Sequence, residues 1–564
     1  MSLPVFSSLG GYRREWLRGD LIAGLTVWAV LVPEALAYAT IAGVSPVVGL
    51  YAAPPALILY AAFGSSKHLV TGPMAATAAL SAAAVADLAT GGTKNFAAYT
   101  VALALVTGAL ALGAGLLRLG FLATFISEPV LKGFIVGLAL TIIIGQVPKL
   151  LGVEKTEGDF FRQLWGLLGN LGETQGVTVV VGLSSLVLVF ALRRFAPAVP
   201  GSLVVVLLGI LAVHVFDLAA HGVDIVGHID SGLPSVGLPH GLAWSDYGKL
   251  VAAGVGVMLV GFAEGLGAAK TYAARDNYDI DPNRELIGLG AANIGAGLSS
   301  GMVVNGSLSK TAVNGSAGAH SQVSGLFVAL MTVITLLFFT SLFEDLPEAT
   351  LAAVVIAALV DLVDYRALMA LYRLYTSELG KIYGPVTRAD FIAAVAAMSG
   401  VLVFDTLPGL FIGIAVSILL LLFRASRPHI AELGKVAGTR NQWTDRGRHP
   451  ENSEVAGIAV LRVEAGLFFA NADDVRNTIK SYAARPGVTA IVLDAESIAG
   501  IDSTATQMVI DLSVELRRVH CQLAIAHGVG QVRDMLRLAD GVKESPLLLF
   551  STVQSAVDSL SARD

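Results

Sequence analysis

The chain has 564 residues, of which 55% are hydrophobic and only 14% are charged, and its formal net charge is -6. Soluble domains carry about a quarter charged residues, so this composition, with a mean hydropathy of +0.72, excludes an ordinary soluble protein and predicts a polytopic membrane protein. The single cysteine, Cys521, excludes an internal disulfide framework, and the lack of a basic stretch argues against a nucleic-acid partner.

Apolar segments that approach the length of a membrane-crossing helix recur along residues 1–424. The first twenty residues are polar, so we expect no cleavable signal peptide. We expect about fourteen helical elements, of which those beginning at 73 and 307 are too short or too interrupted to span fully. The ranges are Leu21–Ile41, Val48–Phe63, Pro73–Leu88, Phe96–Leu116, Val130–Gln146, Val177–Leu192, Ser202–Val215, Leu250–Ala269, Leu286–Leu298, Ser307–Ser316, Ser321–Leu342, Ala349–Val363, Ala389–Phe404 and Pro408–Phe423.

Cationic residues follow most of the even-numbered segments, for example Lys67, Arg118, Arg193 and Arg424. The positive-inside rule therefore places these loops, and both ends of the membrane region, in the cytoplasm. We expect a multi-pass protein of the plasma or inner membrane with the lipid bilayer as its surroundings.

The two halves of the membrane region share a weak repeat. The first half contains Pro33-Glu-Ala-Leu-Ala-Tyr-Ala39 and later Thr71-Gly-Pro73, and the second contains Ala263-Glu-Gly-Leu-Gly-Ala-Ala269 and later Asn305-Gly-Ser307. Each half thus has a lone acid inside a span and then a glycine at the head of a short helix. Seven segments per half make the halves inverted repeats, an architecture of secondary transporters.

The stretch from Gly301 to Asn314 carries the most distinctive polar chemistry of the membrane region. We interpret it as a short extended piece that runs into a half-helix. The start of such a helix has free N–H groups and a partial positive charge, so it favours an anion. The alternative is a polar loop outside the membrane that precedes a helix. The residues that would bind the anion are Ser307, Leu308, Ser309 and Lys310.

A second half-helix start is expected in the first half of the chain. Proline is favourable at the first helical position, which would be Pro73, and Thr71 is a candidate N-cap. The alternative is an ordinary capped membrane helix. Two helix N-termini that point at one place would hold an anion with few side chains. The residues in question are Thr71, Gly72, Pro73, Met74 and Ala75.

Two acids lie inside apolar spans, where a charge is costly and marks a functional position. Glu34 follows Pro33, and Tyr38 lies one turn further on, so both share a helix face. The alternative for Glu34 is a position near the water interface. Glu264 is the repeat-related acid, and we expect it to be the counter-charge of Lys310 when the site is empty. Both acids are candidates for proton coupling.

The composition changes after Phe423. Residues 425–453 are polar and are interpreted as a linker, and residues 454–564 as a small α/β domain in which strands alternate with helices. The expected strands are Val455–Val463, Ala490–Asp494 and Cys521–Ala526, and the expected helices are Asp473–Ala483, Ser503–Val519 and Gln531–Ala539.

Motifs for enzyme chemistry are missing from the sequence. The ten histidines show no HExxH or zinc-ligand spacing, and no GxxxxGK[ST] phosphate loop occurs. We therefore expect no catalytic residues, no metal and no cofactor, and the driving force would be an ion gradient instead of ATP.

Several of these motifs resemble the sulfate permease (SulP) family of anion transporters. They are Pro33-Glu34, Pro46-Val-Val-Gly-Leu-Tyr51, Thr71-Gly-Pro73 and Gly306-Ser-Leu-Ser-Lys-Thr-Ala-Val-Asn314. The C-terminal part is similar to the cytoplasmic sulfate-transporter and anti-sigma-antagonist (STAS) domain of that family, through Ile491-Val-Leu-Asp494 and Ile501-Asp-Ser-Thr504. The resemblance covers nearly the whole chain.

The resemblance implies a seven-plus-seven inverted repeat, about 20–218 and 248–424, with core and gate domains that work as a homodimer by an elevator-like motion. It places the anion at the two half-helix starts, with Glu34, Tyr38 and Glu264 completing the site. Some bicarbonate-transporting relatives use sodium, with a hydroxyl residue one turn after the eighth-helix acid. Gly267 and Ala268 stand there in this chain, which favours protons over sodium.

Ser503 matches the phosphorylation site of stand-alone STAS relatives. It also suits an ordinary N-cap, which we favour. The domain could bind a cytoplasmic protein partner.

Together these features predict a secondary active, proton-coupled anion transporter, with sulfate as the first substrate to test. Bicarbonate or a C4-dicarboxylate are alternatives of the same family. An uncoupled anion channel and a membrane-anchored regulatory STAS protein are alternatives of other classes.

Overall fold

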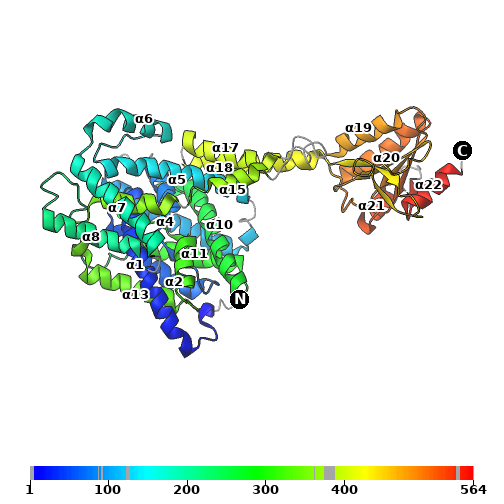
Figure 1. Cartoon of the computed structure of the whole chain (residues 1–564). Helices are drawn as coiled ribbons and strands as arrows, with labels where there is room; N and C mark the ends of the chain where they lie inside the picture. The colour runs from blue at the N-terminus through cyan, green and yellow to red at the C-terminus, as the bar shows by residue number, and fades with distance from the viewer. Residues whose placement is uncertain are drawn as a thin grey trace. The chain divides into compact units, whose positions relative to one another are not determined.

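The computed structural model describes residues 5–86, 88–89, 93–121, 127–196, 199–360, 362–373, 388–404, 406–540 and 547–562. The chain forms two compact units, coloured from blue to red along the sequence in Figure 1. The first unit contains Met1–Leu371 and Asp390–Ala415, and the second contains Tyr372–Ala389 and Val416–Asp564.

The first unit is built almost entirely of helices. Its first half contains α1 (Leu17–Ile41), α2 (Val47–Phe63), β1 (Val70–Gly72), α3 (Ala75–Ala86), α4 (Thr93–Leu116), α5 (Glu128–Leu151), α6 (Phe160–Asn170), α7 (Gly176–Phe195) and α8 (Gly201–Phe216). It continues with α9 (Trp244–Lys249), α10 (Val251–Arg275), α11 (Pro282–Leu298), β2 (Asn305–Ser307), α12 (Leu308–Ser316), α13 (Val323–Phe338), α14 (Glu348–Val360), α15 (Tyr365–Arg373), α17 (Ala389–Phe404) and α18 (Thr406–Ser426). The last residues of α15 and α18 and the first residue of α17 belong to the second unit.

Six helices of the described residues are long and apolar enough to cross a membrane, and five shorter helices are also apolar. The six ranges are Arg14–Ile41, Phe96–Leu116, Glu128–Leu151, Gly176–Phe195, Val251–Arg275 and Thr406–Ser426. This supports the polytopic membrane class, while the number of fourteen spanning elements stays an expectation. The two elements expected to be short are short, since α3 has 12 residues and α12 has nine.

Close packing of helices explains part of the high glycine content. A β-carbon added at Gly290 of α11 would lie 2.6 Å from the backbone nitrogen of Leu112 in α4, and one added at Gly108 would lie 2.7 Å from that of Ile294. Any larger residue would push the two backbones apart. Small residues at helix contacts are typical of membrane proteins, where packing replaces the hydrophobic effect between helices.

The extended pieces before α3 and α12 pair with each other. β1 and β2 form an antiparallel ladder with Val70 opposite Ser307, Thr71 opposite Gly306 and Gly72 opposite Asn305. Backbone N–H and C=O groups inside a membrane must find partners in the protein, and this pairing supplies some of them. It also fixes the starts of the two short helices beside each other.

The second unit contains a six-stranded sheet in the order β4-β3-β5-β6-β7-β8. The strands are β3 (Ile430–Lys435), β4 (Trp443–Asp445), β5 (Ile458–Val463), β6 (Ala490–Asp494), β7 (Gln522–Ala526) and β8 (Leu548–Phe550). The four strands from β5 to β8 are parallel, and β3 pairs antiparallel to both of its neighbours. The helices are α19 (Ala472–Ala483), α20 (Ser503–Arg518), α21 (Gly530–Asp540) and α22 (Val553–Ser561).

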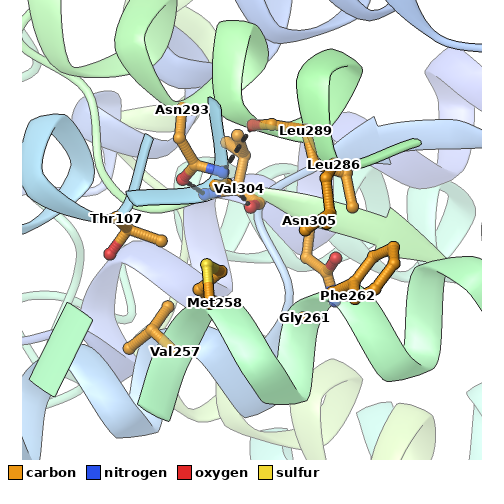
Figure 2. Close-up of a pocket in the computed structure, with 11 residues that line it drawn as sticks. Thr107, Val257, Met258, Gly261, Phe262, Leu286, Leu289, Asn293, Val304 and Asn305 are labelled. Carbon is orange, nitrogen blue, oxygen red and sulfur yellow. Dashed lines mark hydrogen bonds between the residues drawn. The ribbon is translucent and has the colours of Figure 1, made fainter. Parts of the chain in front are cut away.

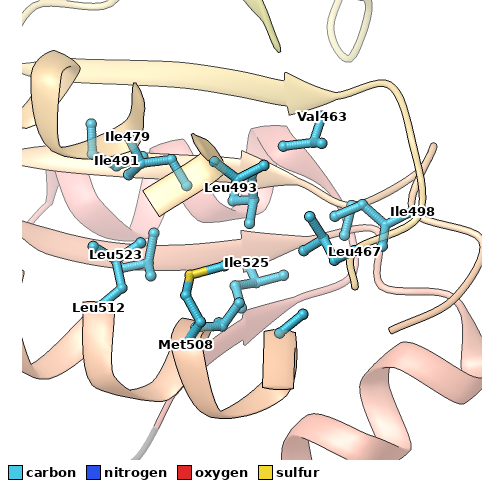
Figure 3. Close-up of a cluster of buried hydrophobic side chains, with 14 of the residues drawn as sticks. Val463, Leu467, Ile479, Ile491, Leu493, Ile498, Met508, Leu512, Leu523 and Ile525 are labelled. Atoms are coloured by element: carbon cyan, nitrogen blue, oxygen red, sulfur yellow. The ribbon is translucent and has the colours of Figure 1, made fainter. Parts of the chain in front are cut away.

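Both faces of this sheet are buried. Ile491 and Leu493 of β6 belong to the core cluster that Figure 3 shows, together with Leu512 of α20. Val492, between them in sequence, belongs to the cluster on the opposite face. The alternation follows from the two-residue period of a strand, and a parallel sheet covered on both faces is the expected result.

The prediction that residues 425–453 form a linker without secondary structure needs correction. β3 and β4 lie within that range, and Ile430 and Glu432 pair with Val463 and Leu461 of β5. The α/β domain therefore begins earlier than composition suggested, because β3 and β4 are short, contain charged residues and lie within a polar stretch.

Candidate functional site

The start of α12 is capped by Ser307. The Ser307 hydroxyl accepts a hydrogen bond from the Lys310 backbone N–H at 3.2 Å and lies 3.2 Å from the Ser309 hydroxyl. Leu308 and Ser309 are exposed, whereas Ser307 and Lys310 are buried. The first turn of this helix thus presents its free N–H groups next to accessible space, which suits an anion.

The start of α3 differs from the expectation. Thr71 is not its N-cap, because Thr71 lies in β1 and its hydroxyl donates to the Ala56 carbonyl at 3.2 Å. The helix begins at Ala75, two residues after Pro73. Pairing of β1 with β2 holds Thr71 and Gly72 in extended backbone, and this delays the first helical turn. Met74 is half-buried and Thr71, Gly72, Pro73 and Ala75 are buried.

Lys310 is the charged centre of the site. Its side chain is 1% exposed, and its Nζ lies 2.7 Å from Glu34 Oε2 of α1. The same Nζ donates to the Pro73 carbonyl at 3.2 Å and lies 5.1 Å from the centre of the Tyr38 ring. The structure therefore gathers α1, the start of α3 and the start of α12 around one ammonium group.

The expected role of Glu264 as the counter-charge of Lys310 is wrong in this structure. Among the described residues, the carboxylate paired with Lys310 is that of Glu34. Glu264 Oε2 instead lies 3.5 Å from the Asn305 side-chain amide, which donates to it. Glu264 lies near the site through Asn305, without pairing with the lysine.

Two asparagines that the sequence analysis missed shape this region. The Asn293 side chain of α11 donates to the carbonyls of Leu289 and Val304 and accepts from the Val304 N–H, each at 2.9 Å. Figure 2 shows Asn293 reaching down to Val304 beside a small cavity that Thr107 and Met258 also line. Asn305 Oδ1 accepts from the Gly306 N–H at 2.7 Å. The sequence offered one signal for Asn293, since it is a lone asparagine in the apolar run before Gly301.

The stretch 304–307 is consequently held by the Asn293 side chain of α11 and by β1. These contacts give part of its backbone partners within the protein. Such a rigid extended piece places the α12 start, Lys310 and the Asn305–Glu264 pair at fixed positions. The site thus combines a helix start, one ammonium group and two carboxyl groups.

Ser503 is not the N-cap of α20, contrary to our preferred interpretation. Asp502 caps the helix, since its Oδ1 accepts from the Ala505 N–H at 2.8 Å and its Oδ2 from the Phe469 N–H at 2.9 Å. Ser503 is the first helical residue and is exposed. Its hydroxyl therefore remains accessible, and a regulatory phosphorylation stays a proposal.

Comparison with known proteins agrees with this architecture. The sequence profile of the sulfate permease family matches residues 17–383, and that of the STAS domain matches residues 449–556. The first match lies mostly in the first unit and the second match lies in the second unit. The chain is a helical membrane protein with an α/β STAS domain, and it belongs to the sulfate permease family.

Individual relatives match over nearly their whole length. A probable sulfate transporter of Mycobacterium tuberculosis is 36% identical and covers 98% of this chain and 97% of its own. Probable sulfate transporter 3.4 of Arabidopsis thaliana is 29% identical and covers 99% of this chain and 87% of its own.

Solved structures show the same fold. Murine solute carrier 26 family member A9, an anion transporter in the inward-facing state, has a TM-score of 0.88 at 23% identity and covers 99% of this chain and 94% of its own. The transmembrane domain of a cyanobacterium bicarbonate transporter has a TM-score of 0.59 at 23% identity and covers 72% of this chain and 98% of its own.

Proposed function

We propose that this protein is a secondary active transporter of a small anion, with sulfate as the first substrate to test. The observation that carries the proposal is the buried Lys310 ammonium at the start of a nine-residue helix. A buried ammonium needs a compensating negative charge, and here that charge comes from Glu34. Family membership and the names of the relatives support the same class of substrate.

Proton coupling is supported by the position of Lys310, whose ammonium group would be shared between the Glu34 carboxylate and the anion. An anion that reaches the α12 start competes with the Glu34 carboxylate for the same ammonium. A proton taken up by Glu34 neutralises the carboxylate and leaves the lysine charge for the anion. Proton entry and anion entry would then favour each other, which is the reciprocity that linkage requires. Glu264, beside Asn305, is the second candidate proton carrier.

The remaining parts of the proposal come from the family. They are a seven-plus-seven inverted repeat with core and gate domains, an elevator-like motion, a homodimer, cytoplasmic termini and a STAS domain that binds a cytoplasmic partner. The paired starts of α3 and α12 support the inverted repeat, because they bring one short helix from each half to a common point.

Bicarbonate and a C4-dicarboxylate suit the same site, since each is an anion that a helix N-terminus and one lysine can bind. The bicarbonate transporter with a similar membrane fold favours testing the first of them. An uncoupled channel and a regulatory STAS protein make different predictions for accumulation, which the following experiment separates.

The test is uptake of labelled sulfate into proteoliposomes with and without an inward proton gradient. The unsubstituted chain is compared with Lys310→Ala and with Lys132→Ala, a control in which the lysine is 40% exposed and pairs with Glu128 on the same helix. We expect gradient-driven accumulation in the unsubstituted chain and the control, and its loss in Lys310→Ala.

Other results would redirect the proposal. Uptake that only equilibrates and ignores the gradient would indicate a channel. A lack of sulfate uptake would move the same assay to fumarate and bicarbonate. A lack of uptake of all three anions would contradict a transporter and favour the regulatory alternative.

A further inference from the structure

Three loops of the first unit meet around one buried histidine, His68, which is 2% exposed and lies between α2 and β1. Its Nδ1 is 3.1 Å from the Tyr278 hydroxyl. Its Nε2 is 3.0 Å from the Ala319 carbonyl and 3.0 Å from Asp276 Oδ2. The imidazole therefore connects the loop before β1 to the loop between α10 and α11 and to the loop between α12 and α13.

The loop that carries His68 is also attached to the anion site. The His68 carbonyl accepts from the Asn314 side-chain amide of α12 at 3.0 Å. The next strand begins at Val70, whose N–H donates to the Thr311 hydroxyl of α12 at 3.0 Å. Gln322 donates from its side chain to the carbonyls of Ser66 and Leu69. Displacement of His68 would thus reach β1 and α12, which hold the half-helix starts.

The hydrogen-bond partners of the imidazole disfavour a second proton on the ring. The Ala319 carbonyl is an acceptor only, so Nε2 must carry a hydrogen, and in the neutral ring Nδ1 then accepts from the Tyr278 hydroxyl. Protonation turns Nδ1 into a donor that faces this hydroxyl. The Tyr278 oxygen already accepts from the Lys67 N–H at 3.3 Å and lies 3.2 Å from the Ser66 hydroxyl, so its rearrangement would disturb the loop.

The charged and titratable groups around His68 do not offset this cost. Burial lowers the pKa of His68 below the ordinary 6.5, which outweighs the opposing effect of the Asp276 carboxylate and the Ala319 carbonyl. The rings of Tyr272 and Tyr278 lie 6.0 and 5.8 Å from the imidazole, and Lys67 lies above the Tyr278 ring. The remaining titratable groups that face the cluster are His320, Asp20 and Glu285. Because the pKa in the folded protein is lowered, the stability that the cluster contributes is present above about pH 6.5 and is lost as the pH falls below it.

We propose that His68 is an acid-sensitive latch that holds the loop before β1 in place while it is neutral and releases it when it is protonated. Release removes support from β1 and from α12, so acid on this face lowers the affinity of the anion site. The positive-inside expectation puts this face in the cytoplasm. Resting on the proposed function, the latch would slow a proton-driven importer when the protons that it brings in accumulate.

The first experiment measures the melting temperature of the purified full chain between pH 7.5 and pH 5.5. His68→Gln keeps a donor side chain but cannot take up a proton in this range. The matched control is His320→Gln, because His320 lies in the same cluster and its ring packs 5.5 Å from Trp16. We expect the acid-induced fall in melting temperature to be smaller in His68→Gln than in the unsubstituted chain, and unchanged in the control. Equal falls in all three proteins would overturn the latch.

A second experiment measures sulfate exchange in proteoliposomes with equal pH on both sides. Between pH 7.5 and pH 5.5 the unsubstituted chain should lose about fivefold more affinity for sulfate than His68→Gln, an effect at the low end of coupling between distinct sites. Identical pH profiles would contradict the proposal. If no variant exchanges sulfate, the proposed substrate fails while the melting experiment still tests the latch.

If His68→Gln does not fold, Tyr278→Phe provides a second test of the latch. It removes the hydroxyl that opposes protonation of Nδ1, so the pKa of His68 in the folded protein should rise toward its ordinary value and the acid-induced fall in melting temperature should be smaller than in the unsubstituted chain. A fall of equal or greater size would count against the assigned role of the His68–Tyr278 contact.

Discussion

The Glu34–Lys310 pair gives the most informative single substitution, Glu34→Gln. Glutamine keeps the size of the side chain and removes its charge. Lys310 then loses the carboxylate at 2.7 Å and keeps the Pro73 carbonyl at 3.2 Å and the Tyr38 ring. Since the lysine side chain is 1% exposed, water cannot replace the missing partner.

The size of the effect follows from the burial of the pair. Removal of one partner of a buried ion pair costs about 3–5 kcal/mol, because the other charge is left uncompensated. An anion bound at the α12 start would restore the compensation. If it recovers about 3 kcal/mol of that cost, its affinity rises about 100-fold, since 1.4 kcal/mol corresponds to a factor of ten. We therefore expect Glu34→Gln to be unstable without anion and strongly stabilised by it.

The assay is thermal unfolding of the purified chain during a sulfate titration, with fumarate and bicarbonate in parallel. Glu34→Gln, Lys310→Met and the double variant form a cycle that isolates the energy of the pair. The double variant should lose less stability than the two single variants added together, and it should lose its response to the anion. A Glu34→Gln protein as stable as the unsubstituted chain without anion, and with the same anion affinity, would refute this account of the site.

Three further substitutions test other parts of the structure. Glu264→Gln should leave anion affinity within about twofold, because the acid does not pair with the site lysine, but it should reduce the pH dependence of uptake. An unchanged pH profile of uptake in proteoliposomes would show that Glu264 takes no part in the coupling. Asn293→Ala leaves the buried N–H and carbonyl of Val304 unpaired, so thermal unfolding should show a loss of about 2–4 kcal/mol in the free energy of unfolding, together with weaker anion binding. An Asn293→Ala protein of unchanged stability would contradict the structural role of Asn293. Asp502→Ala should cost the STAS domain about 1 kcal/mol through loss of the helix cap, and Ser503→Ala should cost little; the reverse order in urea unfolding would restore Ser503 as the cap.

Local signals in the sequence determined much of the architecture. Long apolar runs with few charges determined the membrane class, because helices must satisfy their own backbone groups in lipid. The interrupted runs near Pro73 and Ser307 indicated the two short helices that α3 and α12 form. The alternation of apolar strands and amphipathic helices after residue 454 indicated the parallel part of the sheet. Each of these features depends on neighbours within about twenty residues.

Partners far apart in the sequence were decided by the tertiary structure alone. The sequence favoured Glu264 as the partner of Lys310, and only the packing of α1 against α12 selects Glu34. The strands β3 and β4 became visible only through their pairing with each other and with β5, since their own composition is polar. The cap of α20 depended on whether the first helical residue is 503 or 504, which the hydrogen bond from the Ala505 N–H to Asp502 Oδ1 decides in favour of 503.

The sequence by itself thus determined the membrane class and where charge lies among the apolar segments, because both follow from local hydropathy and composition. The tertiary structure decided which charges meet, which backbone groups pair and which loops gather around His68. These outcomes depend on contacts between residues far apart in the sequence, such as Pro73 with Lys310 at 237 positions and His68 with Tyr278 at 210 positions, and no local pattern encodes them.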